Sequence, residues 1–201
     1  MRSLGGVGGG SGNTPTLLMK EMTEIATQDE DCLGGKALYF NVNCEIAKIF
    51  TPESLERQMF YLACPTCKKK VIDDGTGYRC ENCYKTYEDA VPTYNFSMAI
   101  QDHSEQRIVN CLGEVGEAIL GMKCNEFYTL HEDLDQVKQL GLAQQWKQLT
   151  LTIRAKFDAN GLSTSQDEGP NIRYSAIRAV PTNFKDHSSL LLKRLNLYAK
   201  M

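Results

Sequence analysis

Alternating apolar and polar residues predict that much of this chain forms β-strands. The longest alternating segment is 37–50, in which the apolar residues keep one parity up to Ile46 and then shift to Ala47 and Ile49. A long strand that contains a β-bulge has this pattern. Phe96 shares its parity with other apolar residues, and we expect it to face a core. The shorter segments predicted as strands are 58–63, 94–101, 107–112, 149–157 and 171–180.

Other segments have the spacing of amphipathic helices. Residues 114–120 end at a glycine, and residues 132–146 place apolar residues about one turn apart, with acids in the first turn, where the helix dipole favours them. Residues 184–201 are rich in leucine and predict a C-terminal helix. The segment 17–25 is also amphipathic but is short, and we expect a turn or a strand there instead of a helix.

Four cysteines have the spacing of a structural zinc site. Cys64 and Cys67 form one C-x-x-C pair, Cys80 and Cys83 form a second, and twelve residues separate the two pairs. Two such pairs supply the four thiolates of a closed tetrahedral zinc shell, which leaves no open position for a substrate. The spacing therefore predicts zinc in a structural role.

The segment between the two cysteine pairs predicts a β-hairpin. Residues 69–73 and 77–80 are short strand-like segments, and the Asp and Gly residues between them are typical of a turn. Two cysteine knuckles on a hairpin make a zinc ribbon. The alternative is a pair of disulfides or a redox C-x-x-C motif, which the doubled spacing disfavours.

The order of the elements predicts the fold class. Three strands, a helix and a two-stranded hairpin follow one another, which is the order of a five-stranded OB-fold barrel. An SH3-like barrel or an open meander would suit the strand count, but both lack the long helix between the third and fourth strands. We expect a mainly β protein: a five-stranded OB-fold barrel with an inserted zinc ribbon and a C-terminal α-helix.

Composition and charge narrow the class of protein. The 201 residues are 42% apolar, which is enough for one sizeable core, and no apolar run is long enough to predict a membrane span. Four of the eight cysteines lie outside the ribbon without paired spacing, which favours a reduced intracellular compartment. The net charge of −3 does not indicate bulk electrostatic binding of nucleic acid, although residues 171–201 carry six bases against one acid.

Composition also predicts the domain boundaries. Residues 1–15 are rich in glycine, and we expect a flexible linker or a remnant of cloning. Residues 16–183 are expected to form the OB-fold domain, with the zinc ribbon inserted at 62–88. Residues 184–201 are expected to form a subunit-assembly helix.

The predicted C-terminal helix has more apolar surface than a single docking face needs. Its apolar residues cover an arc of roughly 200° on a helical wheel, about twice what packing on one barrel requires. We expect the excess surface to contact a helix of another chain. The alternative is a terminal helix that docks only on its own barrel. The predicted interface residues are Leu190, Leu191, Leu195, Leu197 and Tyr198.

Several motifs in one order resemble a known family. They are the run ACPTCKKKVID…GYRCENC, the later CLGEVGEAILG, the alternating LTLTIRAKF with its hairpin, and the leucine-rich terminal helix. Together they are similar to the C-terminal DNA-binding domain of the large subunit of replication protein A, the eukaryotic single-strand DNA-binding protein, or of its telomere- or meiosis-dedicated paralogues. The resemblance covers the chain from about Thr16 onward.

The resemblance implies a fold, a ligand and partners. It implies an OB fold with the zinc ribbon between its first two strands, single-stranded DNA across barrel and ribbon, and a C-terminal helix that bundles with two smaller OB-fold subunits in a heterotrimer. It also implies a nuclear protein of DNA replication, DNA repair or telomere maintenance. By position, the ribbon cysteines match the family's zinc ligands. The two cysteines of the first pair are closer together here than in the family, where a four-residue gap is common.

Two positions depart from the family pattern. The family carries stacking aromatic residues on the third strand, and the corresponding residues here are Ile108 and Leu112. Base stacking contributes about 1–3 kcal/mol per base, so other rings must replace them if binding is to remain strong. The candidate replacements are Tyr61, Tyr78, Tyr94 and, although its parity points inward, Phe157. The candidate phosphate contacts are Lys48, Lys69, Arg79, Arg107, Arg154 and Lys156.

Two functions remain open at this point. The first is single-stranded DNA binding by an electrostatic track plus stacking, which the ribbon lysines and the outward Arg154 and Lys156 favour. The second is a subunit-assembly domain with weak DNA contact, which the aliphatic residues on the third strand favour. An enzyme is disfavoured, because the three histidines lie in no catalytic or metal-ligand motif and no P-loop, GxSxG or HExxH sequence occurs.

Overall fold

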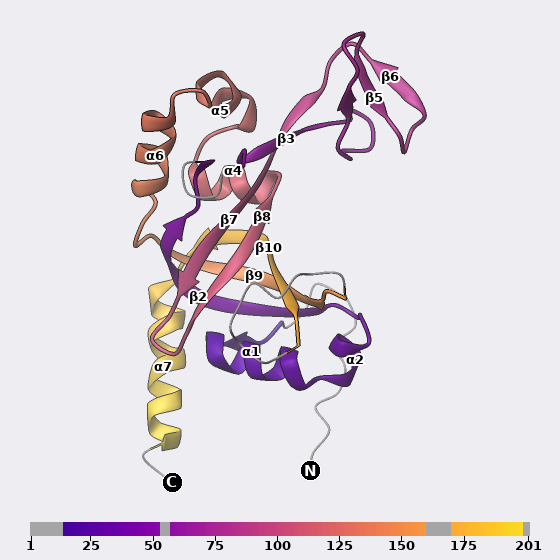
Figure 1. The fold of residues 1–201 in the computed structure, drawn as a ribbon. Helices are drawn as coiled ribbons and strands as arrows, with labels where there is room; N and C mark the ends of the chain where they lie inside the picture. The colour runs from indigo at the N-terminus through magenta and orange to yellow at the C-terminus, as the bar shows by residue number, and fades with distance from the viewer. Residues whose placement is uncertain (1–13, 53–56, 160–169, 199–201) are drawn as a thin grey trace. The chain divides into compact units, whose positions relative to one another are not determined.

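The computed structural model describes residues 14–52, 57–159 and 170–198, shown as a ribbon in Figure 1. Among these residues, seven strands form one sheet in the order β1-β2-β9-β10-β8-β7-β3, and an additional pairing of β2 with β7 closes the middle five into a barrel. The predicted five-stranded OB-fold barrel is confirmed. The strands are β1 (Thr16–Leu17), β2 (Leu38–Ile49), β3 (Phe60–Ala63), β7 (Val91–Gln101), β8 (Gln106–Leu112), β9 (Gln148–Phe157) and β10 (Ile172–Pro181).

The described residues divide into two compact units. Unit 1 consists of residues 14–46, 100–107, 146–159 and 170–198, and unit 2 consists of residues 47–52, 57–99 and 108–145. The hairpin β9–β10 and the C-terminal helix belong to unit 1. The cysteines of the ribbon belong to unit 2.

Unit 1 contains an antiparallel sheet in which β9 pairs with β2 on one side and with β10 on the other. The alternation predicted for residues 149–157 is confirmed, because every second residue from Leu149 to Ala155 is buried. The intervening Thr152 donates a hydrogen bond of 2.8 Å from its hydroxyl to Asn41 Oδ1 on β2. Cross-strand polar pairs of this kind line the outer face, while the apolar side chains form the core.

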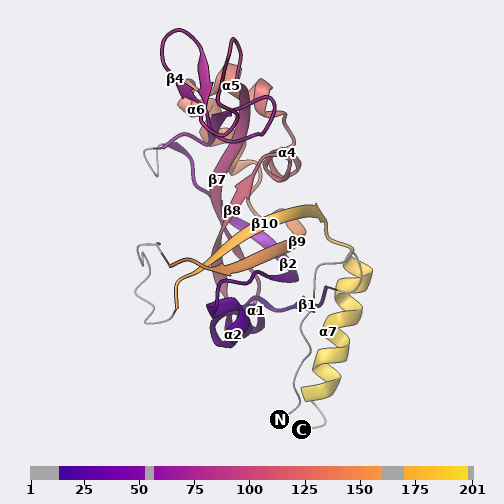
Figure 2. The same ribbon diagram turned by 90° about the vertical axis from the view of Figure 1, so that its right-hand side faces the viewer.

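Helix α1 (Met19–Gln28) shows that the turn or strand predicted for residues 17–25 is wrong. Two carboxylates cap its first turn: the Leu18 N–H donates to Glu21 Oε2, and the Met19 N–H donates to Asp102 Oδ2, both over 2.9 Å. Asp102 lies 83 residues further along the chain, so local sequence could not indicate this cap. Figure 2 shows α1 and the short helix α2 (Glu30–Leu33) beside β2.

The C-terminal helix α7 (Phe184–Tyr198) is attached to the rest of unit 1 by an arginine that is largely buried. Arg194 Nη2 lies 2.8 Å from Glu21 Oε2 and donates to the Thr16 carbonyl oxygen over 3.4 Å. Glu21 therefore caps α1 and also holds α7. Among the described residues, no helix is both long and apolar enough to cross a bilayer.

The apolar surface of α7 extends beyond the side that packs on the rest of unit 1. Leu190 and Leu191 are partly buried against unit 1, where they line a pocket with residues of β2. Leu192 and Leu195 are 60% and 63% exposed. The side chains of Leu197 and Tyr198, also predicted at the interface, lie outside the described residues.

Unit 2 has an aromatic core. The ring of Tyr94 on β7 packs edge to face on Phe96, with centroids 5.9 Å apart, and lies 5.4 Å from the ring of Phe127. All three side chains are buried, so the core position predicted for Phe96 is confirmed. Figure 1 shows the helices that follow β8 in this unit: α4 (Glu114–Leu120), α5 (Cys124–Leu130) and α6 (Leu134–Leu142).

The helices after β8 agree with the sequence pattern only in part. The helix predicted over 114–120 is confirmed as α4. The helix predicted over 132–146 is shorter, because α6 ends at Leu142 and Trp146 adopts a φ of 65° while its N–H donates to the Ile46 carbonyl over 2.8 Å. Helix α5 was not predicted, because its short sequence, CNEFYTL, gives no clear apolar period.

The ribbon forms a small sheet of its own in unit 2. It contains β4 (Ile72–Asp73), β5 (Tyr78–Cys80) and β6 (Lys85–Tyr87), in that order. The predicted hairpin is confirmed by the antiparallel pairing of β4 with β5. Strand β6 was not predicted, since three residues are too few to show alternation. Val71 and two of the cysteines form a buried cluster separate from the barrel core.

Candidate metal centre and nucleic-acid interface

The four ribbon cysteines converge on one point. Their sulfur atoms all lie within 4.8 Å of one another, with 3.8 Å between Cys64 and Cys83 and 3.5 Å between Cys67 and Cys80. A zinc ion with Zn–S bonds of about 2.3 Å at the centre of a tetrahedron places its ligands about 3.8 Å apart. All four cysteines are free thiols, and the sulfurs are too far apart for disulfides. The donor set fits zinc.

Backbone turns aim the sulfur atoms. In the first knuckle the Lys68 N–H donates to the Cys64 carbonyl over 2.9 Å, and in the second the Cys83 N–H donates to Cys80 Sγ over 3.4 Å. The residue after each C-x-x-C pair is left-handed: Lys68 has a φ of 60° and Tyr84 a φ of 55°. Each knuckle reverses the chain within a few residues, which is why both sulfurs of a pair face the same point.

The thiols differ in their affinity for protons. Burial alone would raise the pKa of Cys64, but N–H groups of Cys67 and Thr66, with help from the Tyr87 hydroxyl, lower this pKa to about 6. The pKa of Cys83 is raised to about 12, mainly by hydrogen bonding with Cys67 and to a smaller extent by burial. Cys64 therefore loses its proton readily, whereas Cys83 keeps its proton, because a further thiolate would add negative charge to the same small site. A divalent cation among the sulfurs would remove this resistance.

Unit 1 contains a basic cleft on β9 and β10. Arg154, Lys156 and Arg173 line a cavity of about 240 Å³ together with Phe157 and Ser175. The Nε atom of Arg154 is buried and has no hydrogen-bond partner among the described residues. Asp158 also lines the cavity and pairs with Arg173. Three cations against one carboxylate make this cleft positive, and Arg154 is left with an unused donor.

The structure brings together three of the residues predicted to contact DNA. Arg154, Lys156 and Phe157 share the basic cleft, and Phe157 is only partly buried there. Arg173 and Ser175 were missed by the sequence reasoning. Their position opposite Lys156 and Arg154 depends on the register between β9 and β10, and the hairpin loop leaves that register unspecified in the sequence.

The remaining predicted phosphate contacts lie on several elements. Lys48 is exposed, with its ammonium 5.5 Å from the centre of the Phe50 ring. Arg79 is exposed on β5, and Lys69 donates to Asn82 Oδ1 over 2.7 Å. Arg107 is instead held by Glu105 and by the Thr23 hydroxyl in unit 1. Its guanidinium joins β8 to α1, so it is less available than the others.

The prediction of Tyr94 as a stacking residue is wrong. Its side chain has no exposed surface, and burial raises the pKa of its hydroxyl above the usual range. The ring packs between Phe96 and Phe127, so no base can reach it. The other tyrosines predicted to stack are each partly exposed, Tyr61 on β3 and Tyr78 on β5 of the ribbon.

Two aliphatic side chains are exposed on β8. Ile108 is 57% and Leu112 is 49% exposed, while Val109 and Cys111 between them are buried. The outward positions of this strand are therefore available for contact. Their side chains offer apolar surface and no aromatic face.

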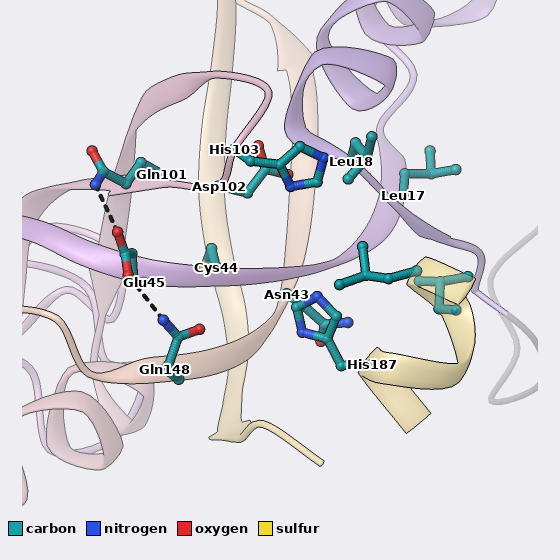
Figure 3. A pocket seen from close by; sticks show the side chains of 12 residues that line it. Leu17, Leu18, Asn43, Cys44, Glu45, Gln101, Asp102, His103, Gln148 and His187 are labelled. Atoms are coloured by element: carbon teal, nitrogen blue, oxygen red, sulfur yellow. Dashed lines mark hydrogen bonds between the residues drawn. The ribbon is translucent and has the colours of Figure 1, made fainter. Parts of the chain in front are cut away.

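A second pocket in unit 1, of about 470 Å³, lies between α7 and β2 (Figure 3). Both carboxylate oxygens of Glu45 are satisfied there, by Gln101 over 2.7 Å and by Gln148 over 2.9 Å. Leucines of α7 and of residues 17–18 form the apolar walls. Because the partly buried carboxylate of Glu45 is already hydrogen-bonded on both oxygens, we interpret the pocket as a packing contact for α7.

The sequence comparison shows the family. The model described as "Replication factor-A C terminal domain" matches residues 39–191, and the chain belongs to this family. It is 30% identical over 151 residues to the replication factor A 51 kDa subunit of Crithidia fasciculata, covering 72% of this chain and 31% of that protein. It is 29% identical over 195 residues to the 70 kDa DNA-binding subunit of replication protein A from Danio rerio, covering 96% and 30%.

Solved structures have the same fold. A replication protein A heterotrimer bound to single-stranded DNA superposes with a TM-score of 0.72 at 22% identity, covering 92% of this chain and 40% of that chain. Yeast replication protein A bound to single-stranded DNA gives a TM-score of 0.65 at 21% identity, covering 91% and 96%. The chain spans about three-tenths of the length of the two relatives above.

Proposed function

We propose that this chain is a single-stranded DNA-binding module of a replication protein A-like large subunit. The basic cleft of unit 1 is the observation that carries the proposal, because it gathers three cations and leaves the buried Nε of Arg154 without a partner among the described residues. Buried donors are nearly always satisfied, and a phosphate oxygen would be a suitable acceptor. Family membership, and the DNA bound in both similar structures, support the same ligand.

Binding would combine charge neutralisation with stacking. The guanidinium groups of Arg154 and Arg173 can each bind a phosphate through two parallel hydrogen bonds. Phe157 in the same cleft offers a ring to a base. Stacking and phosphate contacts tolerate any sequence, so we expect weak base preference and strong dependence on salt.

A fluorescence-anisotropy titration with labelled oligo-dT tests this proposal. The zinc-loaded chain should bind at low salt, and affinity should fall steeply toward physiological salt. Arg154→Met should weaken binding and reduce the slope of log K against log salt by about 0.7, the value expected for one lost phosphate contact on a single strand. Lys36→Met is the matched control, because Lys36 lies outside the cleft in an ion pair with Asp31. The proposal is wrong if the parent chain does not bind at low salt.

Subunit assembly is the second candidate function. The exposed leucines of α7, next to the side that packs on unit 1, favour it. The partners would be two smaller OB-fold subunits, as in a replication protein A-like heterotrimer. DNA binding and assembly use different residues, so one chain can perform both.

We further propose that the ribbon holds zinc in a structural role. Four thiolates suit zinc, and a closed shell of four protein ligands leaves no site for hydrolysis, so we propose no enzymatic activity. The proposed division is a linker at 1–15, an OB-fold domain at 16–183 with the ribbon at 62–88, and an assembly helix at 184–201. Work in replication, repair or telomere maintenance would place the protein in the nucleus, which imaging of a fluorescent fusion tests.

A further inference from the structure

The second zinc knuckle carries an aromatic ring that contributes almost no packing. Tyr84 is 92% exposed, more than any other large hydrophobic side chain among the described residues. Within the same described part of the chain, its hydroxyl has no hydrogen-bond partner and its ring belongs to no aromatic pair. Tyrosine stabilises a fold mainly by burying its ring. This ring buries very little, so the fold of the ribbon does not explain its presence.

The backbone at Tyr84 is also unfavourable for a tyrosine. Its φ of 55° lies in the left-handed region, where the Cβ atom of any residue except glycine is crowded. Glycine would fit this position after Cys83 without strain. The turn of the knuckle sets this conformation, as it does at Lys68, so what calls for explanation is the presence of tyrosine in place of glycine. A strained and solvent-exposed ring therefore indicates a contact outside the chain.

The exposed charges next to Tyr84 in the chain are Glu81, on the same knuckle, and Lys85. Lys68 takes the equivalent left-handed position on the first knuckle and is also exposed. The ribbon carboxylates Asp73 and Asp74 accept hydrogen bonds from backbone N–H groups of the β4–β5 turn. An exposed ring next to an exposed lysine is a combination that binds single strands, in which a base stacks on the ring and a phosphate contacts the cation.

We propose that Tyr84 is a stacking platform for a base of single-stranded DNA, with Lys85 contacting a neighbouring phosphate. The proposal rests on the DNA-binding function proposed above and assigns part of the contact to the ribbon. Because nearly all of the side chain is exposed, a base can stack on it without displacing another side chain. The zinc knuckle fixes the backbone that presents the ring.

Tyr84→Gly separates this role from a structural one. Glycine suits the left-handed backbone, so the variant should keep its zinc content and melt at the same temperature as the parent or higher. Its Kd for oligo-dT should nevertheless rise about 5- to 150-fold, the loss expected for one stacked base. The salt dependence should be unchanged, because no charge is removed. Tyr84→Phe is the control, because it keeps the ring and should bind within about twofold of the parent.

A spectroscopic test reports the stack directly. Trp146 is the only tryptophan in the chain, so Trp146→Phe provides a silent background. In that background, Tyr84→Trp should show fluorescence that oligo-dT quenches. If the parent binds oligo-dT but Tyr84→Gly binds equally well and no quenching occurs, the role of Tyr84 is overturned while the DNA-binding function stands. Failure of the parent itself to bind would contradict the DNA-binding function instead.

Discussion

Gly116 marks the tightest contact in the aromatic core of unit 2. It is buried in α4, and a Cβ atom added there would lie 2.6 Å from Tyr94 Cβ and 3.0 Å from Phe96 Cε1. The helix can approach these rings only because this residue has no side chain. Packing therefore requires glycine at a position where helix propensity alone would favour alanine.

Gly116→Ala should destabilise the protein by about 1–3 kcal/mol, because the rings must move to admit a methyl group. An exposed helix position behaves in the opposite way, since alanine is normally about 1 kcal/mol better than glycine. Urea denaturation measures both effects, with Ala118→Gly on the exposed side of α4 as the comparison. Equal or greater stability of Gly116→Ala would contradict the close packing.

Asp102 joins the loop between β7 and β8 to α1 through its carboxylate. Burial would raise its pKa, but hydrogen bonds from the Ser104 hydroxyl and from the N–H groups of Met19, Ser104 and Glu105 outweigh burial and lower the pKa. A depressed pKa means that the folded state binds the proton less tightly than the unfolded state. Ionised Asp102 therefore stabilises the fold.

The contribution of Asp102 should depend on pH. It is fully present above the unfolded-state pKa of about 3.9 and is lost as the pH falls through the lower folded-state pKa. Asp102→Asn should reduce the free energy of unfolding at neutral pH, and the difference from the parent should shrink as the solution is acidified below about pH 4. Urea denaturation of both proteins across this range measures it. A constant difference would show that the charge of Asp102 is not involved.

At the scale of residues, the sequence predicted correctly those site residues whose positions depend on local spacing. The cysteines converge as their spacing predicted, because two short knuckles define the site. Tyr94 shares its parity with Phe96, which was correctly predicted in the core, so the same pattern argued against Tyr94 as a stacking residue. Arg173 was missed because its place in the cleft depends on strand register across a loop.

At the scale of elements, the ribbon has little packing of its own. Its buried cluster consists of Cys64, Val71 and Cys80, with a few partly buried side chains around it. Structural zinc contributes about 10–16 kcal/mol to folding in zinc-finger peptides, far more than so small a cluster. The barrel has a separate core, for example Leu151 and Ile153 in unit 1.

Removing the metal should therefore unfold the ribbon and leave the barrel folded. After treatment with a strong chelator, hydrogen exchange should accelerate at the amides of β4, β5 and β6, while β2 and β9 stay protected. Cys80→Ser should give the same pattern without chelator. Loss of protection throughout the chain would show that the barrel also depends on the metal.

Elements that depend on distant partners were the ones that sequence did not predict. Helix α1 is capped by Asp102 from a loop far along the chain, and α6 ends before Trp146, whose N–H bonds to β2. The barrel strands β2, β8 and β9 were predicted well, because buried residues alternate with more exposed ones along each of them. Period-2 patterning follows directly from that difference.

At the scale of the molecule, the candidate functions use separate surfaces. The basic cleft lies on the β9–β10 hairpin of unit 1, and the exposed ring of Tyr84 lies on the ribbon of unit 2. The exposed leucines of α7 make a third surface. The net charge of −3 does not indicate the basic cleft, because the cleft depends on a few cations that the fold brings together.

Substitutions on the exposed face of α7 should impair subunit assembly without destabilising the fold. Leu192 and Leu195 are exposed, so Leu192→Glu with Leu195→Glu should change the free energy of unfolding by no more than about 0.5 kcal/mol per substitution. The same change should abolish copurification with the two smaller subunits, because it places charge in an apolar helix bundle. Ser189→Glu with Lys193→Gln changes the net charge equally on a neighbouring exposed face of the helix and should leave assembly intact. Retained assembly of the leucine variant would show that α7 does not recruit partners through this face.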